Sequence, residues 1–135
     1  MDKATVSVSD ALRAAAGVVK DSHTAKLIEL AELWEKRPTL KNAKKVKCQA
    51  MSIAYSYPAE GPHLIVYYAA YAAECTYIAV VYAHYDHNDR AAVYAGFAAE
   101  AARAALRTTS SAVAGFVPLP PTLGRDARPH AALGS

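Results

Sequence analysis

Apolar positions recur every three to four residues along most of the chain, which is the spacing of an α-helix with one buried face. The stripe is clearest between Asp21 and Arg37, where its members are Leu27, Ile28, Leu30, Ala31 and Trp34. Alternation with a period of two, as in a half-buried strand, never persists beyond a few residues. The pattern predicts an all-α fold with helices at about 9–20, 22–37, 39–57, 63–85 and 90–107.

Capping and helix-breaking residues mark the boundaries of these segments. Ser9-Asp10, Asp21-Ser22 and Thr39 are typical N-caps, because their side-chain oxygens can accept hydrogen bonds from unpaired backbone N–H groups. Pro38 ends the second helix, since the residue before a proline avoids the helical region. The run 58–62, Pro-Ala-Glu-Gly-Pro, separates the third helix from the fourth.

The character of the chain changes at Thr108. Residues 108–111 are Thr-Thr-Ser-Ser, which is typical of a turn. Residues 117–121, Val-Pro-Leu-Pro-Pro, are expected to be extended, and 125–135 have no periodic apolar face. We therefore expect one small bundle of four to five helices over 1–108. We expect 109–135 to form an extended, peripheral or disordered tail.

The fourth predicted helix is apolar on almost every side. Its seam runs through Leu64, Tyr68, Tyr71, Cys75, Ile78, Tyr82 and Tyr85. The segment 64–83 could also span a bilayer by length. However, its tyrosines are spread along it instead of gathering at the ends, and Glu74 would lie near mid-membrane. We expect the centre of a bundle and no membrane, with a spanning helix as the alternative.

Glu74 is the one charged residue within that segment. Helical spacing surrounds it with Tyr67, Tyr71 and Tyr77. A buried carboxylate needs hydrogen-bond partners or a raised pKa. The sequence favours a core carboxylate bonded to tyrosine hydroxyls or to an arginine. A ligand-binding or catalytic carboxylate is the alternative.

Charge is distributed unevenly along the chain. The 135 residues carry a net charge of +3, yet the segment 36–47 holds six cations and no acidic residue. These cations are Lys36, Arg37, Lys41, Lys44, Lys45 and Lys47. Because the rest of the chain is net acidic, a uniformly basic nucleic-acid coat protein is disfavoured.

The third predicted helix places these cations on one side. Arg37, Lys41, Lys44, Lys45 and Cys48 share an arc of about 100°, if helical geometry reaches Arg37. The arc is either a solvated surface, a phosphate-binding face or a face for an acidic protein. Because Trp34 and Tyr55 lie outside the lysine run, we expect contact with a nucleic-acid backbone and little stacking of bases.

Residues with catalytic or metal-binding chemistry are few. His84 and His87 are weak metal candidates, and we favour helix-terminal histidines instead. Two cysteines, Cys48 and Cys75, cannot form the disulfide framework of a small secreted domain. The chain begins without the pattern of a signal peptide, so we expect a reducing, cytoplasmic setting. No nucleotide-binding glycine motif occurs, and we expect no cofactor.

The sequence thus predicts a non-enzymatic helical binding protein. Its expected partner is a polyanion, with nucleic acid contacted through 36–47 as the leading hypothesis. The alternative is a protein–protein module, such as an inhibitor, an immunity-type factor or an oligomeric adaptor. This alternative is based on the excess of tyrosine- and alanine-rich helix surface, which could also support a homo-oligomer.

Overall fold

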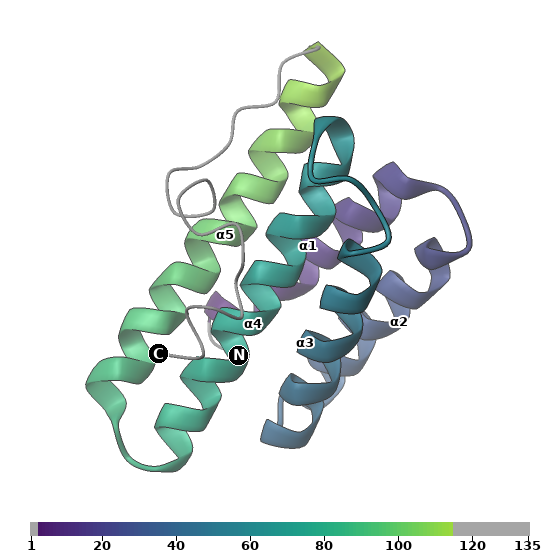
Figure 1. The fold of residues 1–135 in the computed structure, drawn as a ribbon. Coiled ribbons are helices and arrows are strands. Elements are labelled where there is room, and N and C mark those ends of the chain that lie inside the picture. The colour runs from purple at the N-terminus through teal and green to yellow at the C-terminus, as the bar shows by residue number, and fades with distance from the viewer. Residues whose placement is uncertain (1–2, 115–135) are drawn as a thin grey trace.

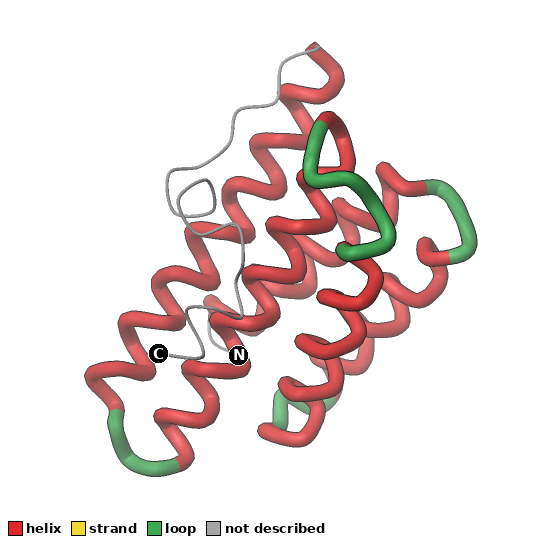
Figure 2. The backbone as a smooth tube through the Cα atoms, in the orientation of Figure 1, coloured by secondary structure: helices red, strands yellow, loops and turns green. Residues whose placement is uncertain are grey.

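The computed structural model describes residues 3–114 and the side chains of residues 8–108. This part of the chain consists of helices joined by loops and contains no strand (Figure 2). The all-α class expected from the sequence is therefore confirmed. The helices are α1 (Lys3–Val19), α2 (His23–Lys36), α3 (Leu40–Ala54), the 3₁₀ turn η1 (Gly61–His63), α4 (Leu64–His84) and α5 (Asn88–Ala114).

The helices pack in two layers (Figure 1). Helix α4 lies between α3 and α5 in one layer, and α1 and α2 lie behind them. Helix α1 contacts α2, α4 and α5, so α1 and α4 share the centre of the bundle. The alanine-rich face of α5 allows close approach, since Ala98, Ala102 and Ala105 are almost completely buried.

Helix α4 is the interior helix that its apolar composition predicts. Thirteen of its 21 residues are buried. The span Gly61–His84 is long and apolar enough to cross a membrane, but most of that apolar segment is buried inside the protein. Burial by α1, α3 and α5 thus accounts for its composition within a helical bundle.

Helices α1 and α2 are joined by apolar packing and one ion pair. Leu12, Leu27 and Leu30 have no exposed surface. At the edge of this contact, Arg13 Nη2 donates to Glu35 Oε1 at 2.8 Å. The hydrogen bond to Arg13 holds the pKa of Glu35 below its ordinary value. Because both side chains are partly exposed, this pair is expected to add little to stability.

Two of the predicted caps form, and two boundaries differ from the prediction. Thr39 Oγ1 accepts a hydrogen bond from the Asn42 N–H, and Asp21 Oδ1 accepts one from the His23 N–H. Helix α1 begins at Lys3 instead of near Ser9. Ser9 and its neighbour Val8 are buried in the bundle, so packing extends the helix through a stretch of weak helix formers.

Helix α5 continues through the predicted turn at 108–111 and ends at Ala114. Thr108 is 2% exposed, and its Oγ1 donates to the Ala104 carbonyl oxygen at 2.7 Å. This bond satisfies the hydroxyl within the helix, so the threonine does not end it. Residues 109–114 therefore belong to the helix, and residues 115–135 of the predicted tail lie outside the described residues.

Candidate polyanion-binding face

Helix α3 buries one side and exposes the other. Its buried side includes Ala43, Val46, Ala50 and Ile53. The lysines of the opposite side, Lys41, Lys44 and Lys45, are all exposed. Their spacing of three and four residues places them together on the helix surface. We call these three residues the α3 lysine face.

The other three predicted cations lie apart from this face. Lys36 is the last residue of α2, and Arg37 follows it with φ −142° and ψ 85°. That backbone conformation is not helical, so Arg37 does not extend the arc of α3 as the sequence analysis assumed. Both side chains are nevertheless exposed near the start of α3. Lys47 is only partly exposed and points toward α4.

No acidic side chain in the described part of the chain neutralises the repulsion between the lysines of the α3 lysine face. Segment 36–47 contains no aspartate or glutamate. Within residues 8–108, whose side chains the structure describes, no ion pair involves any of the six cations. Like charges at helical spacing repel one another, and a bound anion removes that repulsion.

Aromatic residues of α4 lie closer to the basic segment than the sequence suggests. The Lys47 Nζ atom lies 5.0 Å from the centre of the Tyr77 ring, in a cation–π contact. Tyr55, the C-cap of α3, packs edge-on against Tyr67 with ring centroids 6.2 Å apart. No local sequence pattern indicates this neighbourhood, because the lysines and the α4 tyrosines are separated by the loop between α3 and α4.

Glu74 has no exposed surface. A ligand would therefore reach its carboxylate only by displacing neighbouring side chains. Its charge contributes to a raised pKa at Tyr55 and at Cys75, although burial is the larger cause at both residues.

The tyrosines expected around Glu74 also contact other residues. The Tyr67 hydroxyl donates to the Tyr57 carbonyl oxygen at 2.6 Å. The Tyr71 hydroxyl forms a hydrogen bond with the Cys75 thiol. Tyr77 turns its ring to Lys47, as described above. The tyrosines of α4 therefore connect several elements of the bundle.

The fold brings together a second group of titratable residues that no sequence pattern predicts. It lies where the turn between α1 and α2 meets the loop after α3, and its members are Asp21, His23, Tyr57 and His63. The Tyr57 hydroxyl donates to Asp21 Oδ2, and His23 Nδ1 lies 2.8 Å from the same hydroxyl oxygen. Since the hydroxyl has one proton, which it gives to Asp21, His23 Nδ1 is the donor to Tyr57. We call this group the Tyr57 cluster.

The Tyr57 cluster is held together by ring contacts as well as hydrogen bonds. The ring of His63 stacks on that of Tyr57 with centroids 4.7 Å apart. Burial, followed by the hydrogen bond to Asp21, raises the pKa of Tyr57 to about 12. The same hydrogen bond holds the pKa of Asp21 below its ordinary value. These directions suit a structural link and do not suit an ionised tyrosine nucleophile.

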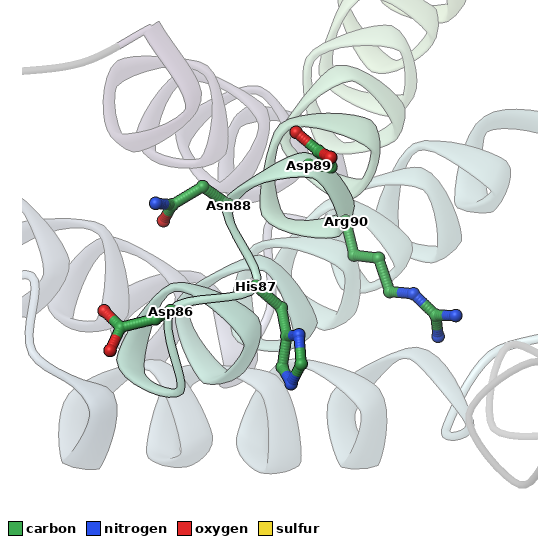
Figure 3. Close-up of a pocket in the computed structure, with 5 residues that line it drawn as sticks. All are labelled: Asp86, His87, Asn88, Asp89 and Arg90. Atoms are coloured by element: carbon green, nitrogen blue, oxygen red, sulfur yellow. The ribbon is translucent and has the colours of Figure 1, made fainter.

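The two histidines considered as metal ligands lie at the turn between α4 and α5. His87 lines a shallow depression of about 370 Å³ with Asp86, Asn88, Asp89 and Arg90. Figure 3 shows that these five side chains point in different directions. His84 instead packs edge-on against Tyr85. In the described part of the chain, no group of three or more His, Cys, Asp or Glu residues could hold a metal ion.

The two cysteines differ in accessibility. Cys48 is exposed, and it lies one helical turn after Lys44. Cys75 is 1% exposed, and burial raises the pKa of its thiol to about 12. Cys48 can therefore serve as a chemical reporter for the α3 lysine face.

In comparisons with known proteins, no family model matches the chain, and no curated protein or solved structure matches it either.

Proposed function

We propose that this chain is a non-enzymatic binding protein that contacts the phosphate backbone of a nucleic acid through the α3 lysine face. One observation carries the proposal: three exposed lysines share one side of a helix in a segment that contains no acidic residue. The remainder of the chain is net acidic, so the positive potential is concentrated at this surface.

The physical basis of such binding is electrostatic. Lysine ammonium groups that contact phosphates release condensed counterions, which favours binding at low salt. Three contacts predict that the logarithm of the binding constant falls with the logarithm of salt concentration with a slope of about −2 on a single strand. Lys36 and Arg37, which lie near the start of α3, add to the attraction at longer range.

A salt titration of a fluorescein-labelled oligonucleotide, followed by anisotropy, tests this proposal. The triple variant Lys41→Glu, Lys44→Glu, Lys45→Glu should weaken binding by about tenfold or more and flatten the slope. Arg103→Glu is a control for charge reversal elsewhere on the molecule, because it reverses one exposed charge on α5 where the triple variant reverses three. Equal affinity of the wild type and the triple variant would contradict the proposal.

A second candidate function is a protein–protein module. It is favoured by large apolar side chains that are exposed in the turn after α4 and on α5: Tyr85 at 66%, Val93 at 52%, Leu106 at 45% and Phe97 at 37%. Exposed apolar surface of this kind is typical of interfaces. Light scattering over a range of protein concentrations tests self-association. A dimer that Phe97→Asp dissociates would support this function, and a monomer at every concentration would argue against a homo-oligomer.

A further inference from the structure

The exposed side of α3 continues beyond its lysines to an aromatic ring. Tyr55 follows Lys44 by eleven residues, and its φ of −70° and ψ of −7° keep it within helical geometry. Eleven residues turn an α-helix through about 20° beyond three full turns, so the two residues share a side about 16 Å apart. Tyr55 is 52% exposed. The lysines, Cys48 and Tyr55 therefore form one strip along the helix.

Contact with Tyr67 holds the Tyr55 ring in place. The Tyr67 ring meets it at an interplanar angle of 66°, and the Tyr67 hydroxyl is anchored on the Tyr57 carbonyl oxygen. The Tyr57 hydroxyl in turn donates a hydrogen bond to Asp21. A ring that is already positioned loses little conformational entropy when a planar group stacks on it.

From this arrangement we infer that the α3 strip binds single-stranded nucleic acid, with phosphates along the three lysines and a base stacked on Tyr55. This inference rests on the proposed function and specifies its ligand. It departs from the sequence-based expectation of little base stacking, because helical geometry places Tyr55 on the same side as Lys44. A single strand offers both phosphates and unpaired base faces, whereas a duplex keeps its base faces inside the stack. An acidic peptide would pair with the lysines but would bring no planar ring to the tyrosine by virtue of its charge.

The inference is tested with three probes of equal length: oligo-deoxythymidine, the corresponding abasic phosphodeoxyribose strand, and poly-glutamate. The wild type should bind oligo-deoxythymidine at least about fivefold more tightly than the abasic strand, since one stacked base adds a factor of this order or more. Tyr55→Ala should remove that preference. Tyr55→Phe should keep it, because the ring is retained, and Phe97→Ala on α5 is the matched control.

The outcomes separate the inference from the function on which it rests. Equal binding of oligo-deoxythymidine and the abasic strand, or a preference that survives in Tyr55→Ala, overturns base stacking and leaves phosphate binding intact. Poly-glutamate binding as tightly as oligo-deoxythymidine overturns the nucleic-acid assignment. Failure of both strands to bind, or binding that is unaffected in the triple lysine variant, overturns the proposed function itself.

Discussion

The Tyr57 hydroxyl donates a hydrogen bond to the carboxylate of Asp21, thirty-six residues earlier in the chain. This bond ties the turn between α1 and α2 to the segment that follows α3. Helices α2 and α3 otherwise contact one another less extensively than α1 and α2 do. The bond therefore joins the two layers at a place where helix packing contributes little.

Tyr57→Phe is expected to destabilise the protein. The substitution removes the donor to Asp21 and the acceptor for His23, while the backbone acceptor for Tyr67 remains. The midpoint of urea unfolding should fall relative to the wild type. Tyr85→Phe is the matched control, because it removes a hydroxyl from a tyrosine that is 66% exposed. Identical midpoints for Tyr57→Phe and the control would show that the bond contributes nothing.

The contribution of this bond should depend on pH at both extremes. Tyr57 has a pKa raised from 10.0 to about 12, so the folded state holds the proton more tightly than the unfolded state does. Its contribution to the free energy of unfolding is therefore complete below pH 10 and is lost as the pH rises toward 12. Asp21 has a pKa lowered from 3.8, so its contribution is complete above that pH and is lost in more acidic solution.

The difference in unfolding free energy between the wild type and Tyr57→Phe should therefore be largest between about pH 4 and pH 10. Absorbance titration of the tyrosines gives an independent check. The wild type should contain a group that ionises near pH 12 and is missing in Tyr57→Phe. A difference in stability that does not change across the whole range would contradict these assignments.

Thr76→Val should stabilise the protein by about 1 kcal/mol, since an unsatisfied buried polar group costs about 1–3 kcal/mol. Thr76 is 4% exposed, and its hydroxyl oxygen has no hydrogen-bond partner among the described residues. Valine has nearly the same shape without the hydroxyl. Urea unfolding measures the change, and Thr108→Val is an informative comparison. Since Thr108 donates to Ala104, its replacement should not stabilise the protein.

The sequence predicted the helices well where local signals agree with packing. Thr39 after Pro38 marks the start of α3, and the apolar composition of α4 predicts its central position. The boundaries that differ are those where packing overrides propensity. Val8 is buried in the core, so α1 begins before it. Buried Thr108 donates its hydroxyl to the Ala104 carbonyl oxygen, so α5 continues past it.

Only part of the candidate site could be predicted from the sequence. Helical spacing brings Lys41, Lys44 and Lys45 together, because these residues belong to one helix. The contact of Lys47 with Tyr77 and the bond between Asp21 and Tyr57 depend on how separate helices pack. No local pattern encodes such a pair, so the Tyr57 cluster and the aromatic surroundings of the lysines emerge only in the folded chain.

The two thiols should react at very different rates with a neutral alkylating agent such as iodoacetamide. Cys48 is exposed, whereas Cys75 is 1% exposed and has a pKa raised to about 12. Because the thiolate is the reactive form, Cys75 should react only after unfolding. Mass spectrometry of the native protein should show one modified thiol, assigned to Cys48 by peptide mapping. Modification of Cys75 in the folded protein would contradict this prediction.

Protection of Cys48 tests most directly whether the exposed side of α3 is the binding surface. Its alkylation rate is measured with increasing oligo-deoxythymidine, while anisotropy reports the fraction of protein bound. We predict that the rate falls in proportion to the bound fraction, and that Arg103→Glu behaves like the wild type. Saturated binding with an unchanged rate of Cys48 alkylation would place the ligand elsewhere on the molecule and contradict the account.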